Sequence, residues 1–265
     1  MGTQARRFAL NLTLLLVVAG LGAWVWWQAH TVEAQAATLL TLERETITRI
    51  AITRELDSDK PSVMRLEKQG DHWQMLEPKA FALNPTRISQ LFTLLDEAVA
   101  ASYPAAGKDL KAYGLEPGTV AVMFNDQRLV FGAENPVSHN RYVLHDGAIK
   151  LVSETVFGLM TGTLEDWFAN KLVPPGRSLQ SVSLPQGYAS QPSTLQNWQS
   201  ADAVHVEAWD GNDTGHGTIT LKLDNGSELA LVLLTTQGEL LLGNKTAGIR
   251  YVLPEVQRGN LLPSQ

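Results

Sequence analysis

The chain opens with an apolar run, residues 8–27 (FALNLTLLLVVAGLGAWVWW), that contains no charged residue. A helix rises about 1.5 Å per residue, so this run reaches roughly 30 Å, the thickness of the hydrocarbon core of a bilayer. Two arginines precede the run, which places residues 1–7 in the cytoplasm by the positive-inside rule. The pattern predicts one transmembrane helix, with Phe8 and Trp27 at its ends and the remaining chain outside the cytoplasm.

A cleaved secretory signal is the alternative interpretation of this segment. A signal also begins with positive charge, and Ala34, Gln35 and Ala36 form an A-x-A-like cleavage site. The apolar run is longer than the roughly 7–15 residues of a usual signal core, which favours an uncleaved anchor. Residues 28–45 are rich in Ala, Gln, Glu and Leu, which predicts a helical continuation or stalk that leaves the membrane.

Beyond the stalk, the pattern changes to short β-type segments. Residues 47–55 (ITRIAITRE) form a β-branched run typical of a strand, and the runs on either side of Gly70 and Asp71 predict a hairpin. Asn84 followed by proline is a helix start. Apolar residues then recur at spacings of three and four, which predicts one apolar face of that helix: Ile88, Leu91, Phe92, Leu95 and Val99.

Two further hairpins follow, with turns at Asn125–Asp126 and Asp146–Gly147. Helical stretches are predicted over residues 153–160 and 164–173. The breaker Pro-Pro-Gly at 174–176 then ends a first module, residues 46–175.

Residues 176–265 predict a second, shortened module with the same plan. SLQSVSLPQ matches the opening strand, TITLKLDNGSELALVLL matches the first hairpin, and Trp198 falls roughly where Trp73 falls. The tetrapeptide RYVL occurs at residues 141–144 and again at 250–253. The sequence therefore predicts an α+β protein: a transmembrane helix followed by two related modules of antiparallel hairpins with packed helices.

The charge of the exported part narrows the function classes. The chain has 21 Lys and Arg against 27 Asp and Glu, a net charge of −6. Beyond the predicted span, 19 basic residues face all 27 acidic ones, a net charge of −8. This net negative charge argues against binding of nucleic acid and against binding of anionic lipid by a polybasic segment. The chain has no cysteine, which excludes disulfides, thiolate metal sites and a cysteine nucleophile.

The first module carries an ordered set of recognisable positions. They are the hairpin with Trp73 and Pro78, the helix from Asn84, the YGL-x-P element (Tyr113, Gly114, Leu115, Pro117), Phe131 with Gly132, and Tyr142 with Val143. In this order and spacing, residues 47–175 resemble the family catalogued as domain of unknown function 4340. The resemblance implies a bacterial protein, often anchored by one N-terminal helix and linked to ABC-type transport or gliding gene clusters. It supplies no enzymatic activity and no catalytic residues.

Two groups of residues suggest metal chemistry, but both have a simpler explanation. His139 and His145 lie near Glu134 and Asp146, yet no third ligand has a tight metal spacing. The loop 209–217 (WDGNDTGHG) resembles a calcium loop only superficially, because the position of the bidentate Glu is occupied by leucine. Hairpin-end histidines and a polar connection between strands explain both groups.

No nucleophile elbow, P-loop or dinucleotide fingerprint occurs in the chain. The sequence therefore indicates no catalytic residue, no cofactor and no metal. The weak candidates for a binding surface are Trp73, Tyr113 and Trp167, of which Trp167 follows the acidic pair Glu165 and Asp166.

We expect a single-pass protein of the bacterial inner membrane, held through residues 8–27, with a cytoplasmic N-terminus and a periplasmic C-terminal region. Its expected role is an interaction or scaffold subunit of an envelope complex, and the resemblance suggests an auxiliary subunit of an ABC-type transport system. A periplasmic module that binds a small molecule or glycan in a groove between the modules is the alternative. An enzyme with dispersed catalytic residues is the third hypothesis.

Overall fold

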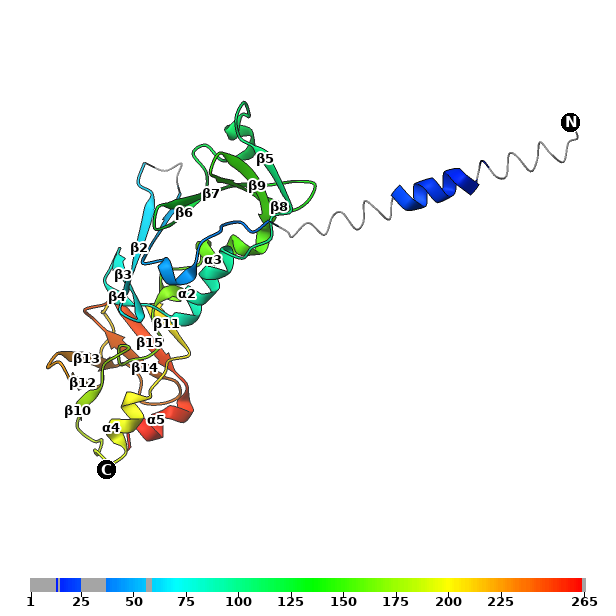
Figure 1. The fold of residues 1–265 in the computed structure, drawn as a ribbon. Helices are drawn as coiled ribbons and strands as arrows, with labels where there is room; N and C mark the ends of the chain where they lie inside the picture. Colours follow the sequence, from blue (N-terminus) through cyan, green and yellow to red (C-terminus); the bar gives the residue numbers. More distant parts are fainter. Residues whose placement is uncertain (1–12, 14, 25–36, 56–58, 264–265) are drawn as a thin grey trace, which may run out of the picture.

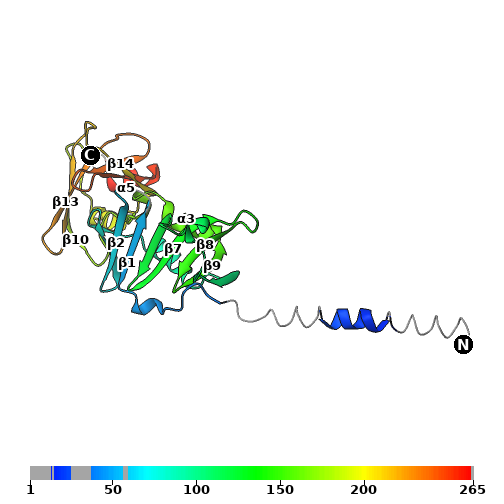
Figure 2. The same cartoon turned by 90° about the horizontal axis from the view of Figure 1, so that it is seen from above.

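The computed structural model describes residues 13, 15–24, 37–55 and 59–263. Within them the fold is α+β, with two antiparallel sheets and few, short helices. Figure 1 shows the two sheets. In Figure 2 the strands of the first sheet lie next to one another, and the second sheet lies at one end of the first. The predicted fold class is confirmed at this level.

The first sheet has nine strands in the spatial order β4-β3-β2-β1-β6-β7-β8-β9-β5. They are β1 (Arg49–Arg54), β2 (Ser62–Gln69), β3 (His72–Glu77), β4 (Phe81–Ala82), β5 (Ala101–Pro104), β6 (Val120–Phe124), β7 (Gln127–Glu134), β8 (Asn140–His145) and β9 (Ala148–Ser153). The three predicted hairpins, β2–β3, β6–β7 and β8–β9, pair as expected. Asn125 and Asp146 adopt positive φ at their turns, the conformation that such tight turns require.

The second sheet has six strands in the order β10-β12-β13-β14-β15-β11. They are β10 (Leu179–Ser183), β11 (His205–Ala208), β12 (Thr218–Leu223), β13 (Glu228–Leu233), β14 (Leu240–Asn244) and β15 (Ile249–Leu253). Its six-stranded order is the same as that of the first sheet once the β2–β3–β4 insertion is left out. In both, an opening strand is followed by two hairpins, and the strand that precedes the first hairpin closes the far edge.

Two details of the predicted repeat are wrong. The RYVL tetrapeptides lie in β8 and β15, which hold different places in their sheets, because β15 corresponds to β9. Trp73 lies in a strand and Trp198 in a helix, so they are not equivalent either. The shared strand order is therefore the evidence for related modules.

The helices are shorter than the apolar periodicity predicts. They are α2 (Pro85–Leu91), α3 (Gly158–Thr161), α4 (Thr194–Gln199) and α5 (Glu255–Leu261), with 3-10 turns at Arg44–Thr46, Phe92–Leu94, Leu110–Tyr113, Glu154–Val156 and Glu165–Trp167. The predicted cap is present, since the Asn84 side chain accepts a hydrogen bond from Thr86 N at 3.0 Å. The expected helix nevertheless gives way to the 3-10 turn after Leu91.

One hydrophobic core runs through both modules. In the first module, α2 packs Ile88 and Leu91 against the sheet. In the second, Trp198 of α4 is fully buried and donates from Nε1 to Leu261 O at 2.9 Å, which joins α4 to α5. The backbone bridge between Leu83 and Phe168 ties the connecting segment to the first sheet. The modules are therefore packed against each other, not strung on a loose linker.

The segment predicted as a stalk is in part built into the first module. Leu39 is 0% exposed, and its amide donates to Glu97 O at 2.7 Å. The amide of Val99 donates back to Ala37 O at 2.9 Å, and Lys150 Nζ donates to Leu39 O at 2.7 Å. Burial lowers the pKa of Lys150, and the charge of Asp146 opposes that shift. The prediction of a stalk over 28–45 is thus wrong for its last nine residues, because buried leucines hold 37–45 in place.

Both predicted ends of the membrane span, Phe8 and Trp27, lie outside the described residues. Residues 15–24 are helical and stand apart from the two sheets (Figure 1). Among the described residues, the structure contains no helix long and apolar enough to cross a bilayer.

Candidate functional site

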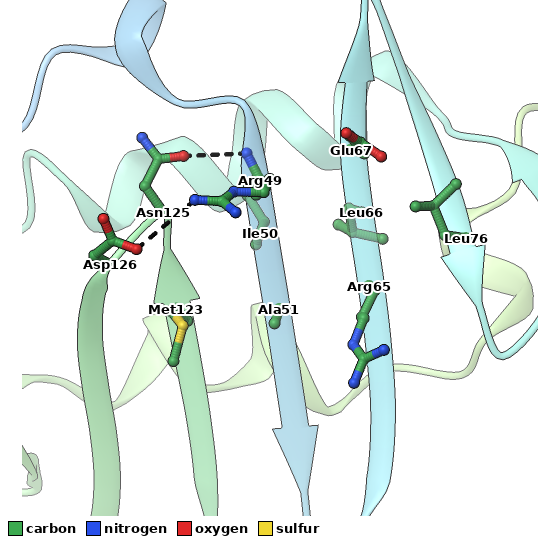
Figure 3. Close-up of a pocket in the computed structure, with 10 residues that line it drawn as sticks. All are labelled: Arg49, Ile50, Ala51, Arg65, Leu66, Glu67, Leu76, Met123, Asn125 and Asp126. Atoms are coloured by element: carbon green, nitrogen blue, oxygen red, sulfur yellow. Dashed lines mark hydrogen bonds and ion pairs between the residues drawn. The ribbon is translucent and has the colours of Figure 1, made fainter.

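One hollow lies on the outer face of the first sheet, the face opposite α2. It has a volume of about 270 Å³ and is shown in Figure 3. We call it the outer-face hollow; its lining consists of residues 49–51 and 65–67, with Leu76, Met123, Asn125 and Asp126. Its floor is made by the short side chain of Ala51 between Met123 and Leu76, which are 38% and 40% exposed.

The charges around this hollow are largely satisfied by each other. Arg49 lies 3.7 Å from Asp126, and Arg65 Nη1 donates to Glu77 Oε1 at 2.6 Å. One solvated face is ordinary for an antiparallel sheet. The outer-face hollow therefore offers a ligand little beyond a shallow apolar strip.

A larger groove, of about 710 Å³, lies where the two modules meet. We call it the junction groove; its lining consists of residues 69–74, 80–82, Lys171, 174–177, Leu229, Asn244 and Tyr251. The β2–β3 turn and β4 come from the first module, and Leu229, Asn244 and Tyr251 come from β13, β14 and β15 of the second. Neither module alone forms this surface.

The second sheet supplies polar groups that are nearly buried in the junction groove. Tyr251 is 2% exposed and Asn244 is 6% exposed. Asn244 Oδ1 accepts from Ala247 N at 3.0 Å, which fixes its amide. Among the described residues, neither Asn244 Nδ2 nor Tyr251 Oη has a hydrogen-bond partner. Neither atom is among the fully sealed unpartnered atoms of the described residues, and both residues line the groove, so the two groups are candidates for contact with a ligand.

The rim of the junction groove is cationic although the chain as a whole is acidic. Lys171 and Arg177 line it together with His72, and Asp71 is the acidic residue among its described lining residues. Arg177 lies 4.0 Å from Asp224. Lys171 Nζ makes no ion pair or hydrogen bond within the part of the chain that the structure describes. The groove therefore presents an unneutralised cation beside aromatic side chains.

Burial raises the pKa of the Tyr251 hydroxyl above its ordinary value. The folded state disfavours the phenolate, so this tyrosine stabilises the fold below about pH 10, the ordinary tyrosine pKa, and that contribution is lost as the pH rises further. We expect the free energy of unfolding of the wild type to fall more steeply above about pH 10 than that of Tyr251→Phe. Chemical denaturation across this range measures the difference. Tyr103→Phe, at a 47% exposed tyrosine of β5, is the matched control and should follow the wild type.

The structure separates the three aromatic residues predicted as binding candidates. Trp73 lines the junction groove and packs edge-on against Phe92, with ring centroids 5.9 Å apart. Tyr113 packs edge-on against Tyr142 at 4.9 Å, away from the groove lining. Trp167 is 0% exposed, so its ring has no face open to a ligand. Its half-buried neighbour is Arg87, whose guanidinium lies 5.2 Å from the ring centroid.

The residues considered for metal chemistry do not converge. His139 Nδ1 lies 2.7 Å from Glu134, whereas His145, at the other end of β8, lies 3.1 Å from Arg128 O. In the loop after β11, Asp210 accepts from Asn212 N at 3.0 Å in a local turn. Within the described part of the chain, no three His, Asp or Glu side chains are grouped as a metal site would need.

The YGL-x-P element is explained by close packing on β7. Gly114 ends the 3-10 turn Leu110–Tyr113 with a φ of 64°, the left-handed conformation that favours glycine. A Cβ on Gly114 would lie 2.8 Å from Ala133 N, and a Cβ on Gly132 would lie 2.4 Å from Tyr113 O. The two glycines therefore let the element and the strand touch, which is a structural role.

The fold defines an α+β protein of two antiparallel sheets joined through one core. Residues 73–203 match the model of the family described as Domain of unknown function (DUF4340). This match confirms the predicted resemblance to the family. The matched segment begins and ends later than predicted and extends over β10 and α4 of the second module. No curated protein and no solved structure matches the chain.

Proposed function

We propose that this protein is a non-enzymatic interaction subunit of a bacterial envelope complex, anchored in the inner membrane by residues 8–27. Its partner is an envelope or transport protein, and the junction groove is the surface that binds it. The observation that carries the proposal is that both modules build this groove together, on one continuous core. Such a composite surface exists only where the two modules are packed together, and a preformed surface lowers the ordering cost of docking.

The exposed helix supports the membrane placement. Six large apolar side chains of the described helical residues are each more than half exposed: Leu15, Leu16, Val17, Val18, Leu21 and Trp24. A helix that is apolar on all sides needs an apolar environment, since water solvates it poorly. A bilayer provides that environment, and the rest of residues 8–27 has the same composition.

The packed segment 37–45 sets how close to the membrane the modules lie. Residues 28–36 alone separate the proposed span from Ala37, which is held by the hydrogen bond from Val99. Nine residues reach at most about 30 Å when fully extended. The end of the first module that holds Ala37 is therefore kept near the membrane surface, whereas the junction groove lies beside β4, at the opposite edge of the first sheet.

Site-specific photocrosslinking in intact cells tests this proposal. A photoreactive residue at Gln69, on the groove rim, should give a discrete crosslink to a membrane or periplasmic protein. The same residue at Lys222, which is exposed on the outer face of the second sheet, is the control and should not give that product. Replacing residues 1–27 by a cleavable signal should reduce the crosslink. Equal products from both sites, or none from Gln69, would contradict the proposal.

A further inference from the structure

We infer that the junction groove binds a carboxylate carried by an extended, acidic peptide segment of the partner. This inference rests on the proposed function, because it specifies the chemistry of the partner. It is carried by the unpartnered hydrogen-bond donors and the cationic rim of the groove.

The nearly buried polar groups point to a ligand. Tyr251 Oη and Asn244 Nδ2 line the groove and have no partner among the described residues, although their side chains are almost withdrawn from solvent. Neither atom is among the described side-chain atoms that are fully sealed without a partner, so both remain accessible from the groove. An acceptor on a ligand in the groove would bond both groups at once.

The balance of donors and acceptors favours a carboxylate. An ionised carboxylate only accepts hydrogen bonds, whereas a sugar hydroxyl both donates and accepts. The groove offers the ammonium of Lys171, the guanidinium of Arg177, the amide NH₂ of Asn244 and the indole N–H of Trp73. Asp71 is the carboxylate that the described lining itself provides. A donor-rich site of this kind suits an acceptor-rich, negatively charged group.

The aromatic side chains favour a peptide over a stacked sugar ring. Tyr251 is 2% exposed and presents little of its ring, and Trp73 is half-buried with an edge against Phe92. Tyr251 therefore offers no open ring face for stacking. Phe81 and Leu229 add apolar lining beside the polar groups, which suits an apolar side chain next to an acidic one.

The groove is held in shape before any ligand arrives. Lys79 Nζ, from the β3–β4 turn, hydrogen-bonds the carbonyl of Ala247 in the β14–β15 turn. His72 lies against the backbone of Gly176, where a Cβ would be only 3.1 Å from His72 Nε2. Preformed walls reduce the ordering cost of binding.

Fluorescence anisotropy with defined peptides tests the inference. The probe is a labelled, end-blocked nonapeptide of three Ala-Asp-Leu repeats, titrated with the full chain in lipid nanodiscs. Its matched control has Asn in place of Asp. We expect the Asp peptide to bind at least about tenfold more tightly, the difference that charge-assisted hydrogen bonds provide, and its binding to weaken with added salt.

Two conservative variants locate the binding site. We expect Tyr251→Phe, which removes one hydroxyl and breaks no bond within the described structure, to weaken binding roughly threefold to tenfold. Lys171→Gln, at an exposed position, should weaken it by a similar factor. Tyr103→Phe and Lys222→Gln, both outside the groove lining, should leave affinity unchanged.

Three results would overturn the inference. They are equal binding of the Asp and Asn peptides, unchanged affinity in both groove variants, or preferential binding of trigalacturonate, which carries carboxylates on sugars. Failure here is distinguishable from failure of the proposed function. A specific crosslink from Gln69 together with no preference for the Asp peptide would retain the docking role and reject the carboxylate.

Discussion

Replacing Gly132 by alanine is expected to lower the melting temperature by roughly 6–12 °C, which corresponds to about 3 kcal/mol for a region of this size. A Cβ at this position of β7 would lie 2.4 Å from Tyr113 O and 2.9 Å from a methyl group of Leu115. Backbone cannot move aside as the end of a flexible side chain can. The backbone of Gly132 is also held in place, because its carbonyl accepts a hydrogen bond from Arg141 Nη1 at 2.6 Å.

Gly158→Ala is the matched control for this substitution. Gly158 begins α3, and, apart from its chain neighbours and the backbone of its own helix, no described residue comes within 4 Å of the position that a Cβ would take there. Alanine should therefore be neutral or stabilise the helix by up to about 1 kcal/mol. Differential scanning calorimetry of the two variants measures the effect. A melting temperature of Gly132→Ala within error of the wild type would show that the YGL-x-P element can shift away from β7.

The second large effect is expected for Trp198→Ala. Truncating a fully buried tryptophan removes apolar contacts and leaves a cavity, at a cost of about 3–5 kcal/mol. Trp198 is 0% exposed and also holds α4 to α5 through its bond to Leu261 O. Because the two modules share one core, we expect the whole protein to melt earlier in a single transition.

A pair of phenylalanine substitutions isolates the hydrogen bond. Trp198→Phe loses the bond to Leu261 O, whereas Trp167→Phe loses none, because Trp167 Nε1 is buried without a partner among the described residues. Both tryptophans are 0% exposed, so the loss of ring volume is comparable. We expect the Trp198 variant to lose about 1–3 kcal/mol more stability, measured by urea denaturation. Equal losses would mean that the bond contributes nothing net.

The hairpins were predictable because their signals are local. Asn125 and Asp146 adopt the positive φ that their turns need, and the flanking strands carry their own apolar pattern. The cap at Asn84 is local as well. Helix length was not predictable from periodicity, because Phe92 and Val99 continue the apolar spacing after the chain has left the α-helix.

The junction groove could not be read from the sequence in this way. Lys171, Asn244 and Tyr251 meet through packing of distant segments, and none stands in a motif. Trp73 was a candidate as an aromatic residue, and Trp167 was a candidate because it follows Glu165 and Asp166, yet Trp167 is buried. The shared RYVL tetrapeptide predicted equivalent strands, and that prediction was wrong. RYVL suits any strand with one buried face, so it carries no information on the place of the strand in its sheet.

The short strand pairing of residues 37–39 with residues 97–99 also determines how the protein responds to mechanical force. A pull on the proposed membrane anchor is first borne by the two backbone bonds between these segments and by the bond from Lys150 to Leu39 O. The strand ladders of both sheets, and the contact of Lys79 with Ala247, lie beyond this clamp. Tension from the membrane would therefore peel residues 37–39 away before it deformed the groove.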